Sequence, residues 1–296
     1  MDNYPDKKFK EIFYNPDFLK SFEPDEIIKI FSETAEVLKK DAPFIKFSLT
    51  EGEAKFIGDT HGDFSTTKYI VREFLKDSEN QYLFFLGDYI DREPEPGGSV
   101  FNLLYLCLLK IRFPDRVYLL KGNHEANYAV ECFPYEFDQE LIEIFGSYGF
   151  KIHDEAVKVF REMPLMIQTQ NGVVAAHGGF PLSGQPIDDK SRKDLIIDIL
   201  WADPDISPTF RGYGIPKFTE EELLNFLNSV NATCFIRGHD YNVGGRAIYS
   251  NRCITVFTSR RYVLHAGITL AKVDLSKKIK DARDIVLEDL SVYLDT

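Results

Sequence analysis

Five short polar segments, each placed directly after an apolar run, constrain this chain more than any other feature of its sequence. They are Gly58–Asp63, Gly87–Arg92, Gly122–Glu125, His177–Gly179 and Arg237–Asp240. Each brings a carboxylate, an amide or an imidazole together with glycine, which lets the backbone turn sharply. Because strand ends in α/β sheets are where functional sites collect, the pattern predicts that these segments contribute to one site.

Apolar periodicity between these segments predicts mixed β and α structure. Helices are expected over residues 24–40, 66–75, 100–113 and 136–145. Strands are expected over residues 54–57, 82–86, 116–120, 173–176, 233–236, 254–257, 262–265 and 268–273, with antiparallel pairing near the end of the chain. The run from Tyr82 to Leu86 is typical of a strand buried on both faces. Thr219 and Glu222 form a capping-box pattern that begins a further helix.

The polar segments extend from Asp59 to His239, so a domain boundary between them would divide the site. We therefore expect a single catalytic domain over residues 1–296. Its first 50 or so residues are expected to be a helical segment, and the residues from about 275 onward a C-terminal tail.

The overall charge and the cysteine content restrict the partners and the compartment. The chain carries 35 Lys and Arg against 47 Asp and Glu, a net charge of −12, which argues against bulk binding to nucleic acid or to an anionic membrane. Residues 1–10 lack the apolar core of a signal peptide. The four cysteines form no C-x-x-C pair and lie in or beside apolar stretches. We expect free thiols and a cytoplasmic protein.

The polar segments supply a mixed set of nitrogen and oxygen ligands. The candidates are Asp59, His61, Asp88, Asn123, His177 and His239. Such a set suits Mn, Fe, Zn or Co better than Ca or Mg alone, and the lack of a cysteine cluster argues against a structural zinc site. Each histidine taken alone is more often a hydrogen-bonded structural residue. The whole set predicts two divalent ions.

These motifs resemble those of the phosphoprotein phosphatases, the metal-dependent Ser/Thr protein phosphatases that include protein phosphatase 1. The resemblance rests on Gly-Asp-x-His-Gly at 58–62, Gly-Asp-Tyr-x-Asp-Arg at 87–92, Gly-Asn-His-Glu at 122–125, His-Gly-Gly at 177–179, Leu-Trp-Ala-Asp-Pro at 200–204, Arg-Gly at 211–212 and Arg-x-His around 239. The compact C-terminal part is similar to a prokaryotic, archaeal-type member. The implied fold is α/β: the calcineurin-like metallophosphoesterase fold, a central β-sandwich of mixed sheets flanked by helices.

The resemblance also implies the roles of the site residues. Asp59, His61 and Asp88 would hold one metal, and Asp88, Asn123, His177 and His239 the second. The expected ions are Mn²⁺, with Fe or Zn as alternatives. A hydroxide bridging the two ions would attack phosphorus directly.

The remaining roles concern the leaving group and the phosphate. His124 is the expected general acid, oriented by Asp91. Arg92 and Arg211 would bind the phosphoryl oxygens, with Asn123 also contacting substrate and Tyr262 lining the cleft. Each has an alternative: His124 as a third metal ligand, Arg92 as a structural partner of Asp91, Arg211 as an exposed loop charge, and Tyr262 as a half-buried strand residue.

Two segments depart from the family pattern. The acidic, proline-containing segment Glu93–Gly98 follows Arg92, where the family usually has glycine. Thr258–Arg261 replaces the family's Ser-Ala-Pro-Asn, and a short loop follows Tyr262. We hypothesise that Arg260 and Arg261 add positive charge to the cleft rim and offset the acidic segment.

The sequence thus predicts a metal-dependent phosphatase acting on phosphoserine and phosphothreonine in proteins or peptides. The alternative is a diadenosine-polyphosphate hydrolase or a broad-specificity phosphoesterase of the same superfamily, although residues 201–204 and Arg211 argue against the dinucleotide. A catalytically inactive phosphoprotein-binding module is a further alternative, but no expected ligand is missing from the sequence.

Overall fold

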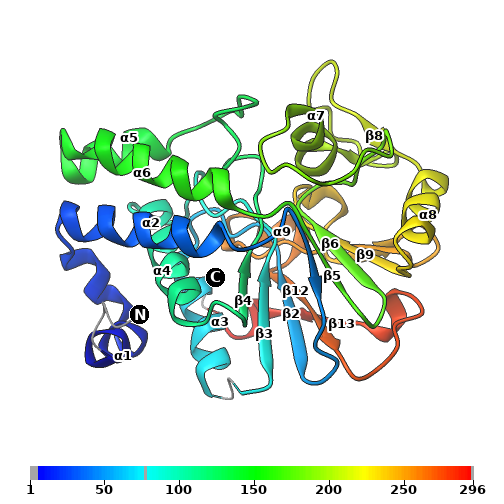
Figure 1. Ribbon diagram of the computed structural model, residues 1–296, viewed down its shortest axis with the longest axis horizontal. Coiled ribbons are helices and arrows are strands. Elements are labelled where there is room, and N and C mark those ends of the chain that lie inside the picture. The colour runs from blue at the N-terminus through cyan, green and yellow to red at the C-terminus, as the bar shows by residue number, and fades with distance from the viewer. Residues whose placement is uncertain (1–5, 77–78, 295–296) are drawn as a thin grey trace.

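The computed structural model describes residues 6–76 and 79–294, which form two stacked mixed sheets with helices outside them (Figure 1). The six-stranded sheet has the spatial order β1 (Phe44–Phe47), β5 (Met166–Thr169), β6 (Val173–Ala176), β9 (Cys234–Arg237), β11 (Cys253–Thr255) and β10 (Arg246–Ile248). The five-stranded sheet has the order β13 (Val286–Asp289), β12 (Thr269–Asp274), β2 (Glu53–Ile57), β3 (Gln81–Phe85) and β4 (Val117–Leu119). Strands β7 (Asp203–Pro204) and β8 (Lys217–Phe218) pair separately. The predicted β-sandwich of mixed sheets flanked by helices is confirmed.

Most helices lie beyond the five-stranded sheet, as the left side of Figure 1 shows. They are α1 (Asp6–Tyr14), α2 (Pro24–Leu38), α3 (Phe64–Lys76), α4 (Gly98–Arg112), α5 (Phe137–Phe145) and α6 (Tyr148–Glu162). Two further helices, α7 (Lys193–Ile196) and α8 (Glu220–Ser229), cover the outer face of the six-stranded sheet. A short helix, α9 (Val263–Ala266), precedes β12.

Strand β3 shows how one sequence run serves two cores. Tyr82 and Phe84 pack between the two sheets, whereas Leu83 and Phe85 pack against the helical layer. Because side chains alternate along a strand, only an uninterrupted apolar run can fill both layers. The prediction of a strand buried on both faces is confirmed.

The predicted helices and strands hold with one exception, but the expected helical N-terminal segment also contains β1, and the expected C-terminal tail contributes β13 to the five-stranded sheet. The capping box at the start of α8 is present, since the Thr219 hydroxyl accepts from the Glu222 amide at 3.3 Å and the Glu222 carboxylate accepts from the Thr219 amide at 2.7 Å. The antiparallel pairing expected near the end is found between β12 and β13. The strand predicted over residues 262–265 is wrong, because Tyr262 ends a 3₁₀ turn and residues 263–266 form α9.

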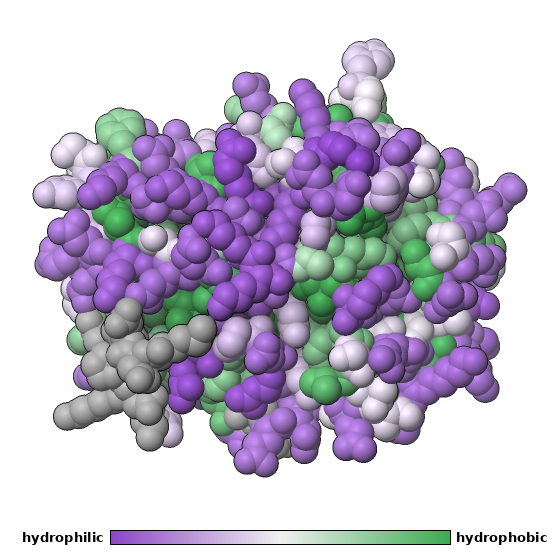
Figure 2. Space-filling model, viewed as in Figure 1, coloured by the Kyte–Doolittle hydropathy of each residue, from purple (hydrophilic) through white to green (hydrophobic). Residues whose placement is uncertain are grey.

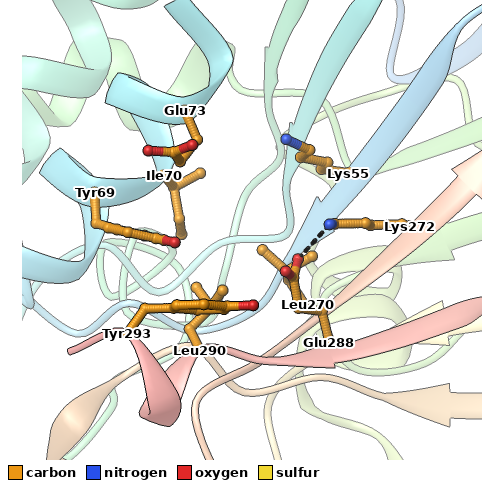
Figure 3. A pocket seen from close by; sticks show the side chains of 9 residues that line it. All are labelled: Lys55, Tyr69, Ile70, Glu73, Leu270, Lys272, Glu288, Leu290 and Tyr293. Atoms are coloured by element: carbon orange, nitrogen blue, oxygen red, sulfur yellow. Dashed lines mark ion pairs between the residues drawn. The ribbon is translucent and has the colours of Figure 1, made fainter. Parts of the chain in front are cut away.

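A cavity of about 300 Å³ lies between α3 and the strands β2, β12 and β13 of the five-stranded sheet (Figure 3). The rings of Tyr69 and Tyr293 lie nearly parallel across it, with centroids 5.9 Å apart. Lys272 forms an ion pair with Glu288 at 2.7 Å on its wall. None of the residues that line this cavity belongs to the five polar segments.

Hydrophilic side chains cover much of the face shown in Figure 2, with hydrophobic side chains in smaller patches between them. Within the described residues, no helix combines the length and the apolar character that a membrane span requires.

Candidate dimetal and phosphate-binding site

The five polar segments meet where strands of both sheets end. Asp59, Asp88 and Asn123 follow the parallel strands β2, β3 and β4, and His177 and His239 follow the parallel strands β6 and β9. The two sheets are joined at this edge, because Asp59 forms a β-bridge with Phe257, beyond β11. The carboxyl ends of strands from both sheets therefore face one site.

The backbone of the site adopts left-handed conformations at residues other than glycine. Positive φ angles are found at His61 (44°), Asp88 (57°), Asp91 (63°), Arg92 (58°) and His239 (71°). Such conformations are uncommon outside glycine and cluster where function requires a particular side-chain direction. The turns that follow the strands thus aim these side chains into the site.

Asp88 lies at the centre of two groups of buried metal-type ligands. One ligand atom of each residue lies within 4.8 Å of the others in the group Asp88, His177 and His239, and in the group Asp88, His61 and His124. Asp88 Oδ1 is 3.4 Å from His177 Nε2, and Asp88 Oδ2 is 3.6 Å from His61 Nε2. Its two carboxylate oxygens therefore face the two groups separately.

Asp59 and Asn123 complete the predicted set at its two ends. Asp59 Oδ2 is 4.0 Å from His61 Nε2, and both of its carboxylate oxygens accept from the His239 amide, at 2.8 and 3.1 Å. Asn123 Oδ1 is 3.0 Å from His177 Nε2. All six predicted ligands are thus brought together.

The hydrogen bonds of the histidines leave nitrogens that fit metal ions. His61 Nδ1 and His177 Nδ1 lie 3.1 and 2.9 Å from the carbonyl oxygens of Ile90 and Leu86, so these nitrogens donate. In the neutral ring each Nε2 then carries a lone pair that points into the site. His61 Nε2 and His239 Nε2 are buried without a hydrogen-bond partner among the described residues, and His177 Nε2 faces only oxygen acceptors. Unsatisfied buried groups are costly, and cations would satisfy them.

The three candidate histidine ligands differ in their electrostatics. Burial, with nearby arginine charge, holds the pKa of His239 well below its ordinary value, and burial does the same for His61. Burial also opposes a charge on His177, but Asp88 and Asp59 outweigh it and raise the pKa of His177. Neutral imidazole is the form that binds metal. The site geometry and the donor types therefore fit two divalent ions that share Asp88.

Two glycines keep the carboxylates close to the neighbouring backbone. A Cβ atom on Gly122 would lie 2.2 Å from Asp88 Oδ1, and a Cβ atom on Gly238 would lie 2.2 Å from Asp59 Oδ1. Any side chain at either position would displace a candidate metal ligand.

Glu125 is a site residue whose role the sequence did not reveal. Its buried carboxylate accepts from the backbone amides of Asp88, Tyr89 and Gly122, at 2.8, 2.8 and 2.9 Å. It thereby ties the turn after β3 to the turn after β4. Its place next to His124 in the Gly-Asn-His-Glu motif was the one available signal.

His124 and Asp91 form a hydrogen-bonded pair beside the dimetal groups. His124 Nδ1 is 2.5 Å from Asp91 Oδ2, while Asp91 Oδ1 accepts from the amides of Glu136 and Phe137, at 2.8 Å each, at the start of α5. Burial opposes a charge on His124, but Asp88 and the bond to Asp91 outweigh it and raise the pKa of His124 well above its ordinary value. The ring is thus oriented, and its charged form is favoured.

Arg92 and Tyr262 lie on the same side of the site. The Arg92 guanidinium donates to the Phe133 carbonyl at 3.4 Å, and the Tyr262 ring lies 5.8 Å from the His61 ring and 4.9 Å from the ring of Tyr241. Tyr262 is half-buried, but it reaches the site from a 3₁₀ turn instead of the predicted strand.

Arg211 is held by a buried acid. Its Nε donates to Asp203 Oδ2 at 2.8 Å and its Nη2 to the His239 carbonyl at 2.9 Å. Asp203 Oδ1 in turn accepts from the fully buried Arg237 at 2.7 Å. Asp203 and Arg237 are therefore positioning residues whose contacts the sequence did not reveal, although both lie within the motifs that carry the resemblance.

The acidic segment after Arg92 is fastened to the opposite loop. The Arg260 guanidinium contacts Asp63 at 2.9 Å and Glu95 at 2.6 Å. Asp63 also accepts from the Thr66 amide at 3.1 Å, near the start of α3. Arg260 therefore offsets the acidic segment by direct pairing, and Arg261 is the exposed member of the two.

Proteins similar to this chain in sequence include named serine/threonine-protein phosphatases. The chain is 29% identical to serine/threonine-protein phosphatase T of Trypanosoma brucei brucei over 265 residues, which are 84% of this chain and 54% of the relative. It is 29% identical to human serine/threonine-protein phosphatase 5 over 255 residues, 81% of this chain and 49% of that protein. The chain thus spans about half the length of these relatives. Both are eukaryotic proteins, and the prokaryotic character of this chain stays a prediction.

A solved structure agrees in fold. A protein serine/threonine phosphatase from Saccharomyces cerevisiae, with similarity to human phosphatase PP5, superimposes with a TM-score of 0.79 at 21% identity and covers 95% of each chain. The family described as calcineurin-like phosphoesterase matches residues 54–242, more than half of the sequence, and includes all six candidate metal ligands. The chain belongs to the calcineurin-like phosphoesterase family.

Proposed function

We propose that this chain is a metal-dependent phosphatase that removes phosphate from serine and threonine side chains of proteins or peptides. The observation that carries the proposal is the position of Asp88, whose two oxygens face two separate groups of buried ligands. The names of the curated relatives support the substrate class.

Two divalent ions would be held by Asp59, His61 and Asp88 on one side and by Asp88, Asn123, His177 and His239 on the other. When bound, such ions polarise the phosphoryl group and lower the pKa of water, so that a nucleophile is available near neutral pH. The mixture of imidazole and oxygen ligands favours Mn²⁺, with Fe or Zn as alternatives.

The residues around the ligands supply the remaining tasks. His124 Nε2 is buried and has no hydrogen-bond partner among the described residues, so it is free to donate a proton to the departing serine or threonine oxygen. Asp91 keeps the ring oriented from the Nδ1 side. Arg92 and Arg211 would bind the phosphoryl oxygens, with Asn123 and Tyr262 beside them.

A substrate comparison tests the proposal. Protein stripped of metal and reloaded with Mn²⁺ should hydrolyse phosphoserine and phosphothreonine peptides faster than a diadenosine polyphosphate or a phosphotyrosine peptide. Preferential cleavage of the dinucleotide would contradict it and favour the alternative hydrolase. Activity that does not depend on added metal would contradict the dimetal chemistry.

We also propose that the protein acts in the cytoplasm. All four cysteines are free and buried, which supports action in the reducing cytoplasm. Cell fractionation with an antibody against the chain would test this, and recovery in an oxidising compartment would contradict it.

A further inference from the structure

A third group of metal-type ligands lies beside the candidate general acid. Asp91, His124 and Cys132 are buried, and one ligand atom of each lies within 4.8 Å of the others. Cys132 belongs to the loop between β4 and α5, and its amide donates to Asn127 Oδ1 at 2.9 Å. The thiol is not among the ligands predicted for the dimetal site, and the proposed reaction does not use it.

The three side chains form a chemically distinct ligand set. Thiolate, imidazole and carboxylate are the ligands that Zn²⁺ takes in proteins, commonly three from the protein with a fourth position open. Thiolate is a poor ligand for Mn²⁺, which prefers oxygen and binds more weakly than Co²⁺ or Zn²⁺. A thiolate and a carboxylate also balance the charge of one divalent ion, so the buried site would be neutral.

The geometry needs little adjustment. Metal–ligand bonds of about 2.0–2.3 Å place neighbouring ligand atoms roughly 3 to 4 Å apart, so shifts of the order of 1 Å would close the group. Asp91 Oδ1 is held by the first amides of α5, which leaves Oδ2 beside His124 Nδ1 as the ligand oxygen.

The two nitrogens of His124 face different ligands. His124 Nε2 lies 3.9 Å from Asp88 Oδ2, on the dimetal side, whereas Nδ1 lies 2.5 Å from Asp91 Oδ2. The third group therefore uses Nδ1 and leaves Nε2 toward the dimetal ligands.

We propose that Asp91, His124 and Cys132 form a third metal site that takes Zn²⁺ or Co²⁺ but not Mn²⁺, and that its occupation inhibits the enzyme. Binding forms bonds from the metal to sulfur, nitrogen and oxygen and releases the thiol proton and the His124 Nδ1 proton to solvent, with no change of oxidation state. The Nε2 proton stays on the ring, but the metal replaces the hydrogen bond from His124 Nδ1 to Asp91 that orients it. The inhibitory effect therefore rests on the proposed role of His124 as proton donor, whereas the binding itself does not.

Cobalt spectroscopy tests the binding without reference to activity. Mn²⁺-loaded protein is titrated with Co²⁺, and thiolate-to-cobalt charge transfer is followed in the near ultraviolet. The dimetal ligands contain no sulfur, so exchange of Mn²⁺ there adds no such band. We expect the band in the parent and in Cys107→Ser, whose buried thiol lies in α4, and its loss in Cys132→Ser. Absence of the band in the parent, or its persistence in Cys132→Ser, would overturn the proposal.

X-ray absorption at the zinc edge tests whether sulfur binds the added metal, and it needs no variant. Mn²⁺-loaded parent protein with one added equivalent of Zn²⁺ should show a sulfur neighbour at about 2.3 Å. A shell of nitrogen and oxygen alone would overturn the site.

Inhibition is then measured with a phosphothreonine peptide. Zn²⁺ should inhibit the Mn²⁺-loaded parent, and Cys132→Ser should need at least about tenfold more Zn²⁺ for the same inhibition while its basal rate is unchanged. Equal inhibition of both proteins would overturn the regulatory part. A parent inactive on every phosphoester would instead contradict the proposed function, and the cobalt band would still decide the site.

Discussion

Asp91 connects the candidate proton donor to the protein frame. One of its oxygens pairs with His124 and the other accepts from two amides of α5, so the position of the imidazole depends on a helix that makes no other contribution to the site. This arrangement orients the ring before any substrate binds, and such prior orientation supplies much of the effect of a general acid.

We expect His124→Gln to lower kcat for a phosphoserine peptide by about 10²- to 10⁴-fold, the range for loss of a general acid. The loss should be much smaller for para-nitrophenyl phosphate, because nitrophenolate leaves without a proton. Steady-state kinetics on both substrates measure the difference. Metal content determined on the same samples is the control.

An equal loss on both substrates would show that His124 acts elsewhere, for example as a metal ligand. A drop in bound metal in His124→Gln would point to the same conclusion.

Asp88 should be the residue whose loss removes the most metal. Because its two oxygens face two ligand groups, Asp88→Asn should weaken both sites, whereas Asn123→Ala should weaken one. Elemental analysis after dialysis against a fixed Mn²⁺ concentration measures this. Retention of one full equivalent by Asp88→Asn would argue against a shared ligand.

At this scale the sequence singled out the residues that the structure brings together after the strands, because those residue types sit in recognisable segments. Their metal and proton roles stay predictions. It did not identify what Glu125, Asp203 and Arg237 contact. These side chains bond to backbone groups or to one another across segments far apart in the chain, and neither spacing nor composition records such contacts.

At the scale of the elements, an acidic side chain of α5 contacts the start of α4 and affects the stability of the fold. Glu140 of α5 reaches this helix end, where its carboxylate accepts from the Val100 amide at 3.2 Å. Burial, with Glu93 nearby, raises the pKa of Glu140 to about 8 from an ordinary 4.5. Between these values the folded chain keeps a proton that the unfolded chain releases, so stability falls as pH rises through this window.

We expect Glu140→Gln to remove that dependence. The variant should match the parent near pH 4.5 and exceed its stability above about pH 8 by the order of 2 kcal/mol, less than the full shift would give because the group is not completely buried. Urea unfolding of both proteins across this range measures the effect. Parallel pH curves for parent and variant would contradict it.

Arg260 joins two segments of the chain by pairing with Asp63 and Glu95, so its removal should lower the free energy of unfolding. Arg260→Ala removes the contacts to buried Asp63 and to Glu95 and should cost about 2 kcal/mol, below the range for fully buried pairs because Arg260 is partly exposed. Arg261→Ala is the matched control and should be neutral. Urea unfolding midpoints compare the two, and equal midpoints would refute the role of Arg260.

Element prediction succeeded where apolar spacing was regular and failed where tertiary contacts override it. The Tyr-Val-Leu-His run at 262–265 has strand-forming residues, yet it folds as a helical turn that ends at Gly267, whose φ is 66°. There the Tyr262 ring packs against Tyr241 and Phe257. Strand β1 and helix α6 were not singled out either; β1 has only four residues.

Over the whole molecule, two sheets with separate cores share one functional edge. The sandwich core lies between them and a further core on each outer face, so the edge is supported from both sides. The carboxylates and imidazoles buried there fit metal ions, so the stability of the fold should depend on bound metal.

Metal removal should therefore lower stability. Mn²⁺ at about 100 times its Kd should stabilise the fold by about 2.7 kcal/mol per site relative to protein treated with chelator. Thermal unfolding with and without chelator measures this, with Asp88→Asn as a control that should respond weakly. An unchanged Tm for the parent would mean that no metal binds at the sheet edge.

The left-handed backbone at the sheet edge also restricts how such a chain can vary. His61, Asp88, Asp91 and His239 are of the residue types that, after glycine, adopt positive φ most readily, so at these positions the needs of the backbone and of the chemistry coincide. Alanine at these positions would neither favour the positive φ angle nor supply the ligand or carboxylate. In a library selected for folding alone, Asn, Asp, His and Gly should therefore outnumber Ala at these four positions, and mutational tolerance should be low even before any activity is demanded.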